Sequence, residues 1–228
     1  MKKKVEFDEF VKDYRKKQDG YLSATGEDSD FFARYKVHLL ATWLESELKE
    51  PNQILDFGCG DGLMTSYLAY YFNNSKVFGA DISQDSIDLA KQASPKLSFS
   101  CIDSELEFKE ESFDIIVAAG VFHHIPFCEH SFWINQMIRC LKPGGKLVIF
   151  EINPLNPGSQ YIFRNNPMED NAKMLFPWYT KKLLRVYGEV KTRFFCFFPG
   201  FLSHFRFLER YLEIVPLGGL YATLLTKK

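Results

Sequence analysis

Short apolar segments alternate with amphipathic segments along the middle of the chain, and this alternation strongly limits the folds open to it. Strands are predicted at residues 53–57, 76–80, 97–102, 113–119 and 146–151. Helices are predicted between several of them, up to residue 72 and over residues 86–93 and 129–141. Strands that alternate with helices form a parallel sheet joined by right-handed crossovers. We therefore predict an α/β fold.

The sequence on either side of this region predicts helices before it and irregular structure after it. Helical spacing marks residues 5–18 and 30–49, with Asp30 as the N-cap of the second helix and a loop over residues 20–29. Residues 153–177 hold four prolines and five asparagines, which indicates a long loop or lid. The prediction is completed by a helix over 181–187, a strand over 189–197, a helix over 200–214 and a strand over 221–226.

Composition and charge exclude several classes of protein. A net charge of −1 with 25% charged residues is ordinary for a globular protein, and it argues against nucleic-acid binding through an overall basic surface. The five cysteines form no C-x-x-C pair, so we expect no disulfide framework, no metal site and a reducing compartment. Because we find no signal-peptide core and no apolar run of 18 residues, we expect a cytoplasmic protein, at most peripheral on the inner face of a membrane.

A glycine-rich loop follows the strand over residues 53–57. Its sequence is Asp56-Phe57-Gly58-Cys59-Gly60-Asp61-Gly62, and a predicted helix comes directly after it. Glycines permit a tight turn and the close approach of a ligand, and a helix N-terminus offers free N–H donors. A tight turn that binds nothing is the alternative interpretation.

Two further carboxylates end the next two predicted strands. Asp81 could accept hydrogen bonds from a ribose diol, or cap the following helix, and Asp103 could bind a ligand or cap a turn. The carboxyl ends of parallel strands share one edge of the sheet, where such folds bind ligands. A dinucleotide-binding loop would have a third glycine where this chain has Leu63. Asp56 would repel a phosphate and attract an ammonium group, so the loop favours a nucleoside that carries an amino-acid tail.

At this point the chain resembles a known family, the class I S-adenosylmethionine (SAM)-dependent methyltransferases. Residues 54–62 look like the first motif of that family and residues 77–83 like the second, and residues 112–117 and 141–147 match the later motifs in order and spacing. The resemblance covers residues 53–151. It implies a Rossmann-like, seven-stranded, mainly parallel sheet with an antiparallel last strand. It also implies SAM as the cofactor and S-adenosylhomocysteine as the product.

The resemblance also implies a division of the chain and a role for each motif residue. We expect one domain over residues 1–228, with a helical cap (1–50), a SAM-binding core (51–151) and an acceptor lid that completes the sheet (152–228). The implied cofactor-binding residues are Asp56, Gly58, Cys59, Gly60 and Gly62 for the methionine end, Asp81 for the ribose, Ile82, Asp103 and Ser104 for the adenine, and Gly120 and Val121 beside the methyl donor.

Catalytic residues are predicted at two places. His124 stands where many small-molecule members of the family have a histidine that accepts a proton from the acceptor, although it could instead shape its loop by local hydrogen bonds. A zinc site at His123 and His124 would need further ligands. In related enzymes a tyrosine of the N-terminal segment faces the sulfonium, which makes Tyr14 a catalytic candidate and Arg34 a cofactor-binding one. The aspartate that usually follows that tyrosine is replaced here by Arg15, and Tyr14 could be a core aromatic.

The acceptor is predicted to be a small molecule or a lipid-linked compound, methylated on oxygen. Residues 118–121 lack the (N/D)-P-P-(Y/F) motif of enzymes that methylate amino groups of DNA bases, and no nucleic-acid partner is expected. Segments at 153–157, 197–199 and 216–219 (NPLNP, FFP, PLGG) resemble a bacterial subgroup of the family. Seven phenylalanines between Phe194 and Phe207 could contact a membrane surface, or simply fill a core.

Two other functions stay open at this stage. A non-catalytic SAM-binding subunit would keep the same motifs while activating a partner. A nicotinamide-dependent oxidoreductase would bind NAD, which Asp56 and Leu63 disfavour.

Overall fold

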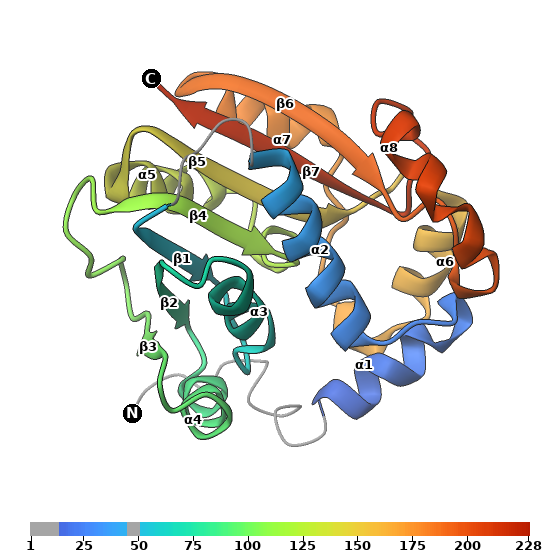
Figure 1. The fold of residues 1–228 in the computed structure, drawn as a ribbon, viewed down its shortest axis with the longest axis horizontal. Helices are drawn as coiled ribbons and strands as arrows, with labels where there is room; N and C mark the ends of the chain where they lie inside the picture. The colour runs from blue at the N-terminus through green and yellow to red at the C-terminus, as the bar shows by residue number, and fades with distance from the viewer. Residues whose placement is uncertain (1–13, 45–50) are drawn as a thin grey trace.

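The structure, a computed structural model, describes residues 14–44 and 51–228 and contains a seven-stranded sheet in the order β3-β2-β1-β4-β5-β7-β6 (Figure 1). The strands are β1 (Gln53–Phe57), β2 (Lys76–Asp81), β3 (Ser98–Cys101), β4 (Phe113–Ala119), β5 (Leu141–Ile152), β6 (Gly188–Phe195) and β7 (Leu220–Lys227). Neighbours from β3 to β5 pair in parallel, and β7 runs antiparallel to both β5 and β6. The predicted α/β fold with an antiparallel last strand is confirmed.

Helices cover both faces of this sheet. They are α1 (Tyr14–Leu22), α2 (Ser29–Leu44), α3 (Leu63–Tyr71), α4 (Gln84–Ala93), α5 (His130–Cys140), α6 (Pro157–Arg164), α7 (Pro177–Leu184) and α8 (Glu209–Leu212). Short 3₁₀ segments are η3 (Ser23–Thr25), η4 (Phe122–His124), η5 (Pro167–Glu169) and η6 (Gly200–Leu208). Alternate residues of β4 point to opposite faces: Ile115 and Val117 pack with α2 and α3, and Ile116 and Ala118 pack with α5 and α7.

Parallel pairing brings the chemistry-bearing strand ends together. Asp56 of β1 pairs with Gly79 of β2 and with Val117 of β4. All five parallel strands therefore end on one side of the molecule, and α1, α6 and the η6–α8 segment lie on that side (Figure 1). The edge of the sheet where the sequence predicts a ligand thus lies on the same side as α1, α6 and the η6–α8 segment.

The region predicted as a long loop after Glu151 contains a helix and a 3₁₀ turn, so that prediction was wrong. Pro157 stands at the first turn of α6, where a missing N–H costs nothing, and the Asn156 side chain caps that helix by accepting from the Ser159 N–H. Asn166 caps η5 in the same way. Prolines taken as helix breakers are helix starts here.

The N-terminal boundaries also differ from the prediction. Helix α2 begins at Ser29, and Asp28, not Asp30, accepts a hydrogen bond from the Phe31 N–H at 2.8 Å. Helix α1 and η3 occupy most of the segment predicted as a loop over residues 20–29. The part of the predicted first helix before residue 14 lies outside the described residues. The predicted helix over 200–214 is mostly 3₁₀, with α8 as its single α-helical turn.

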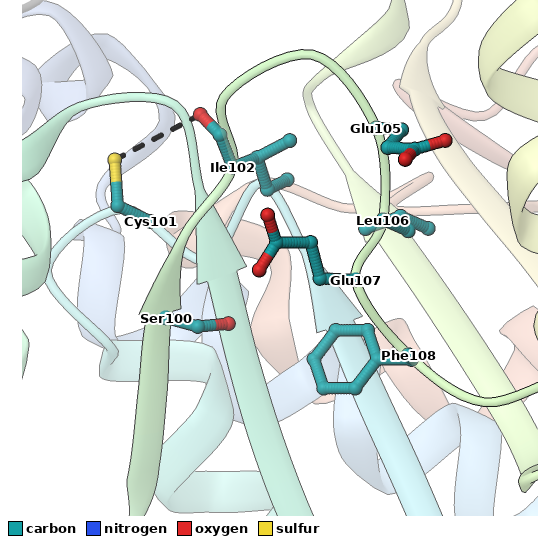
Figure 2. Close-up of a pocket in the computed structure, with 7 residues that line it drawn as sticks. All are labelled: Ser100, Cys101, Ile102, Glu105, Leu106, Glu107 and Phe108. Atoms are coloured by element: carbon teal, nitrogen blue, oxygen red, sulfur yellow. Dashed lines mark hydrogen bonds between the residues drawn. The ribbon is translucent and has the colours of Figure 1, made fainter.

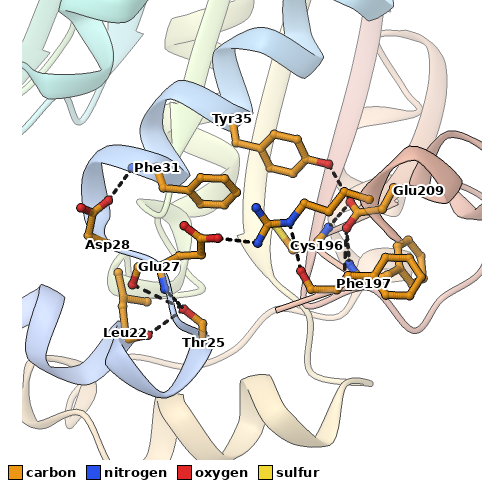
Figure 3. A network of polar contacts seen from close by, with 11 residues as sticks. Leu22, Thr25, Glu27, Asp28, Phe31, Tyr35, Cys196, Phe197 and Glu209 are labelled. Atoms are coloured by element: carbon orange, nitrogen blue, oxygen red, sulfur yellow. Dashed lines mark hydrogen bonds and ion pairs between the residues drawn. The ribbon is translucent and has the colours of Figure 1, made fainter. Parts of the chain in front are cut away.

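A polar network ties the N-terminal helices to the C-terminal segment (Figure 3). Glu209, 4% exposed, accepts from the Tyr35 hydroxyl at 2.6 Å and from three consecutive N–H groups, those of residues 196, 197 and 198. Arg206 pairs with Glu27 at 2.6 Å and stacks over Phe31. The two segments that cover the ligand edge are therefore held to each other as well as to the sheet.

Candidate active site

The glycine loop between β1 and α3 is held in a conformation that favours glycine at three positions. Gly58, Gly60 and Gly62 have φ angles of +74°, +53° and +81°. A Cβ at Gly58 would lie 2.4 Å from a methyl carbon of Val121, and one at Gly62 would lie 2.9 Å from the Phe99 ring. The loop therefore packs closely against both the end of β4 and the β3 strand.

The backbone donors of this loop are largely satisfied within the protein. The Gly58 and Cys59 N–H groups both donate to the Ala80 carbonyl, at 2.7 and 3.1 Å, and the Gly60 N–H donates to an Asp81 carboxylate oxygen at 2.8 Å. The Gly62 N–H donates back to the Cys59 carbonyl. A loop arranged in this way has few donors left for a phosphate. Its geometry thus agrees with the preference that Asp56 indicated.

Asp56 is a buried carboxylate beneath the loop, 2% exposed. It accepts a hydrogen bond from the Thr65 hydroxyl at 2.6 Å. Burial raises the pKa of Asp56 to about 7, and the charge of Asp81 acts in the same direction, while the Thr65 hydrogen bond and the Lys36 charge oppose it. A nearby cationic group would therefore stabilise the ionised form of Asp56.

Lys36 of α2 is a residue of this site that the sequence analysis missed. Burial lowers the pKa of Lys36, and the charges of Cys196, Glu151 and Asp56 act against that shift. The buried residues Ala33 and Leu40 lie three and four positions from it on α2, and this spacing could have identified Lys36 as inward-facing. The predicted Arg34 is exposed on the same helix.

The predicted ribose and adenine residues follow β2 and β3. Asp81 accepts from the N–H groups of Gly60 and Ser83, and the hydroxyl of Ser83, not Asp81, caps α4. Ile82 is 45% exposed, which leaves its apolar side chain available to a ligand. Asp103 and Ser104 are exposed as well.

A pocket lies beside this adenine segment, between the end of β3 and the chain that follows it (Figure 2). Its lining residues are Ser100, Cys101, Ile102, Glu105, Leu106, Glu107 and Phe108. Asp103 and Ser104 lie in the chain between two of these residues but do not line it. The pocket therefore adjoins the predicted adenine residues without containing the glycine loop.

The Cys59 side chain packs with Ile87, Ala90 and Phe99, so only its backbone belongs to the loop surface.

The side chain of Tyr14 lies outside the described residues. Its neighbour Arg15 donates to the Asp61 carboxylate at 2.5 Å, so α1 does lie against the glycine loop.

Two histidines and two glutamates gather just beyond β4. His123 of η4 is 4% exposed, and its Nδ1 lies 2.5 Å from the Glu151 carboxylate, which also accepts from the Phe122 N–H. On its other side, Nε2 of His123 lies 3.3 Å from Oε2 of Glu169, and Nε2 of His124 lies 3.5 Å from the same oxygen. Burial lowers the pKa of His123, but the charge and hydrogen bond of Glu151, followed by those of Glu169, raise it to about 10.

This cluster adjoins the glycine loop. A Cβ at Gly120 would lie 3.6 Å from the His123 ring, and Val121, the next residue, touches Gly58. Glu151 and Glu169 were not among the predicted site residues. Glu151 could have been noticed as an acid at the end of a predicted strand, whereas Glu169 came from the region taken for a loop.

Comparisons with known proteins agree with this geometry. Residues 55–149 match the family model described as a methyltransferase domain. The chain is 32% identical over 138 residues to a ubiquinone biosynthesis O-methyltransferase of Coxiella burnetii, covering 54% of this chain and 57% of that protein. It is 31% identical over 122 residues to a phthiotriol/phenolphthiotriol dimycocerosates methyltransferase of Mycobacterium ulcerans, covering 52% and 43%. The chain thus spans about half the length of these curated relatives.

Solved structures share the whole fold at low sequence identity. A SAM-dependent methyltransferase from Thermotoga maritima superposes with a TM-score of 0.67 at 19% identity, over 97% of this chain and 98% of that one. Another, from Archaeoglobus fulgidus, gives 0.64 at 19% identity, over 85% and 94%. Residues 55–149 thus match a methyltransferase domain, and the chain shares its fold with solved structures of SAM-dependent methyltransferases.

Proposed function

We propose that this protein transfers the methyl group of SAM to a hydroxyl oxygen of a small-molecule or lipid-linked acceptor. The observation that carries the proposal is the buried Asp56 carboxylate beneath a glycine loop whose own donors are already bonded. Such a loop suits the ammonium group of an amino-acid tail better than a pyrophosphate. Transfer then consists mainly of holding the acceptor oxygen in line with the methyl group, which removes a large part of the barrier.

The proposed cofactor contacts follow the strand order. Asp56 binds the ammonium group of SAM, and the backbone of the loop from Gly58 to Gly62 surrounds its methionine end. Asp81, whose carboxylate also accepts from the N–H groups of Gly60 and Ser83, accepts from the ribose hydroxyls. The adenine lies against Ile82, near Asp103 and Ser104, and Gly120 and Val121 border the methyl group. Arg34 stays a predicted cofactor-binding residue, and no contact among the described residues favours it over Lys36 in that role.

The acceptor class rests on two supports. Relatives named as a ubiquinone biosynthesis O-methyltransferase and a phthiotriol/phenolphthiotriol dimycocerosates methyltransferase match about half of this chain, and those names point to lipid-linked acceptors. The second support is the histidine–glutamate cluster at the end of β4, beside the proposed methyl position, where a hydroxyl proton can be removed. His124, the predicted base, belongs to this cluster, and Tyr14 stays a candidate for a contact with the sulfonium.

We further propose that the C-terminal segment contacts a membrane surface. Large apolar side chains are exposed along η6, α8 and the following turn: Phe201, Phe205, Phe207, Tyr211, Ile214 and Leu217. Phe194 and Phe195, by contrast, are buried in the core, so only part of the phenylalanine-rich segment serves packing. None of the helices within residues 14–44 and 51–228 is both long and apolar enough to cross a bilayer. Contact would therefore be by surface insertion of these side chains.

The first experiment is calorimetric binding of SAM, S-adenosylhomocysteine and NAD to the purified protein. We expect the first two to bind and NAD not to bind. Asp56→Ala should weaken SAM binding, while Cys128→Ser, a change at an exposed residue far along the chain from the loop, should not. Binding of NAD, or unchanged SAM affinity in Asp56→Ala, would contradict the proposed cofactor site. SAM binding without turnover on any acceptor, until cell extract is added, would favour the non-catalytic subunit instead.

A further inference from the structure

Three side chains at the end of β4 converge on one point. Nε2 of His123, Nε2 of His124 and a carboxylate oxygen of Glu169 all lie within 4.8 Å of one another. Both histidines come from η4, and Glu169 comes from η5, more than forty residues later in the chain. With ligand bonds of about 2.0 Å, two ligands of a tetrahedral ion lie about 3.3 Å apart. The Nε2–Oε2 distances of 3.3 and 3.5 Å are close to that ligand–ligand distance.

A second, independent observation concerns the other nitrogen of His123. Its Nδ1 lies 2.5 Å from the Glu151 carboxylate, which is itself held by the Phe122 N–H at 3.0 Å. With the Nδ1 proton donated to Glu151, a metal ion that displaces the proton of Nε2 would meet a lone pair directed at the cluster. This carboxylate–histidine arrangement is how metal-binding histidines are usually oriented.

The two carboxylates of the cluster favour positive charge between them, which either a proton on the imidazoles or a metal ion can supply. His123 lies between two carboxylates, and Glu151 is 2% exposed. Oε2 of Glu169 is buried and accepts no hydrogen bond from any residue within the described ranges. An acceptor oxygen in that position is costly unless a proton or a metal ion compensates it. The surroundings of Glu169 are fixed, because the Lys173 N–H after η5 donates to the His123 carbonyl at 2.8 Å.

We propose that His123, His124 and Glu169 bind a divalent transition-metal ion of the zinc type, whose remaining coordination position receives the acceptor hydroxyl. Two histidines and one carboxylate are a common ligand set of catalytic zinc sites, which keep one position open. This inference rests on the proposed methyl transfer, and it departs from the expectation of no metal site, because Glu169 adds the further ligand that the two adjacent histidines would need. It assigns His124 as a metal ligand in place of a base.

The chemistry of such a site is simple. The ion lowers the pKa of the bound hydroxyl, whose proton passes to solvent water. The resulting oxygen attacks the methyl carbon, so that one O–C bond forms as the S–C bond of the sulfonium breaks, and neutral S-adenosylhomocysteine leaves. No oxidant or reductant takes part.

The other histidines of the described chain provide controls. His204 and His38 are exposed, and the two ring nitrogens of His130 already contact the Tyr179 hydroxyl and two carbonyls. Exposed histidines can bind zinc weakly, as can the exposed Cys128. His204→Ala therefore matches His124→Ala in residue type, and Cys128→Ser removes another exposed zinc-binding side chain; both residues lie outside the cluster.

The test is titration of chelator-treated protein with Zn²⁺ in competition with a chromogenic chelator. We expect one ion per chain, with affinity lowered at least tenfold in His124→Ala and in Glu169→Gln and unchanged in both controls. Glu151→Gln should lower it about tenfold through the orientation of His123. Co²⁺ should give the intense visible absorption of a tetrahedral site. Thermal unfolding in chelator verifies that each variant folds.

Two results would overturn the metal site: no stoichiometric Zn²⁺ binding, or binding that survives His124→Ala and Glu169→Gln but is lost in a control variant. SAM calorimetry on the metal-free protein separates this failure from failure of the proposed function. SAM binding and turnover that persist in chelator would leave the methyltransferase intact and remove only the ion. Loss of SAM binding in every condition would remove the proposed function itself.

Discussion

If the buried Asp56 carboxylate pairs with the ammonium group of SAM as proposed, SAM binding should depend on pH. The Asp56 pKa of about 7 lies more than three units above the ordinary value of 3.8, chiefly because of burial. Only the ionised form pairs with an ammonium group. Between pH 7 and pH 5 the ionised fraction of free Asp56 falls from about one half to about one hundredth, so SAM affinity should fall about fiftyfold, or about 2.3 kcal/mol.

The assay is isothermal calorimetry at constant ionic strength, at half-unit steps over this range. Other titratable groups near Asp56 are Asp81, whose charge raises its pKa, and Lys36, whose charge lowers it. Asp56→Asn keeps the shape and can still accept from Thr65, so it isolates the titration. It should bind SAM weakly and with a nearly flat pH profile. Equal slopes in the two proteins, or constant wild-type affinity down to pH 5, would refute the assignment.

The same carboxyl group has the opposite effect on the ligand-free fold. Since the folded pKa of Asp56 is raised, the stability it contributes is fully present below pH 3.8 and is lost as the pH rises through about 7. Asp56→Asn should therefore raise the melting temperature of ligand-free protein at pH 8, and raise it less at pH 5. A variant that is less stable than wild type at pH 8 would contradict this sign.

Three further predictions concern the covering segments, the loop and the exposed aromatics. Glu209→Ala should lower the free energy of unfolding by about 2–3 kcal/mol in urea, because it leaves several buried donors unpaired; a loss below 1 kcal/mol would disagree. Gly58→Ala should lower SAM affinity at least tenfold, because its Cβ would lie 2.4 Å from the Val121 side chain. Gly60→Ala should lower SAM affinity less, because the space around Gly60 is open. A larger loss of affinity in Gly60→Ala than in Gly58→Ala would count against the loop geometry. Phe201→Ala with Phe205→Ala should reduce binding to anionic liposomes in a flotation assay without changing SAM affinity, and wild-type protein that does not float would end the membrane proposal.

Local sequence patterns were sufficient to predict the strands and the cofactor edge. The apolar segment at β4 and the glycine loop after β1 carry their own signals, a buried strand and a turn that needs positive φ. Parallel pairing then places Asp56 and Asp81 at one edge, since strand direction alone decides where strand ends lie. Helix α6 was not predicted because Pro157 was taken as a helix breaker. Proline breaks a helix at most positions but is favoured in the first turn, and only the chain before Pro157 shows that it stands in the first turn.

The amino-acid sequence by itself thus determined the α/β sheet, the order of its predicted ligand-binding motifs and the residues that form the glycine turn after β1. Only the tertiary structure decided which side chains from distant segments meet there. The charge of Lys36 acts on Asp56 because α2 packs across the sheet, and Glu169 reaches His123 because η5 is anchored beside η4. The physical reason is that hydrophobic periodicity and turn preferences act between residues that are close in the chain. A cluster of charged side chains depends instead on long-range packing, which brings these side chains within about 4 Å, where their electrostatic interaction becomes strong.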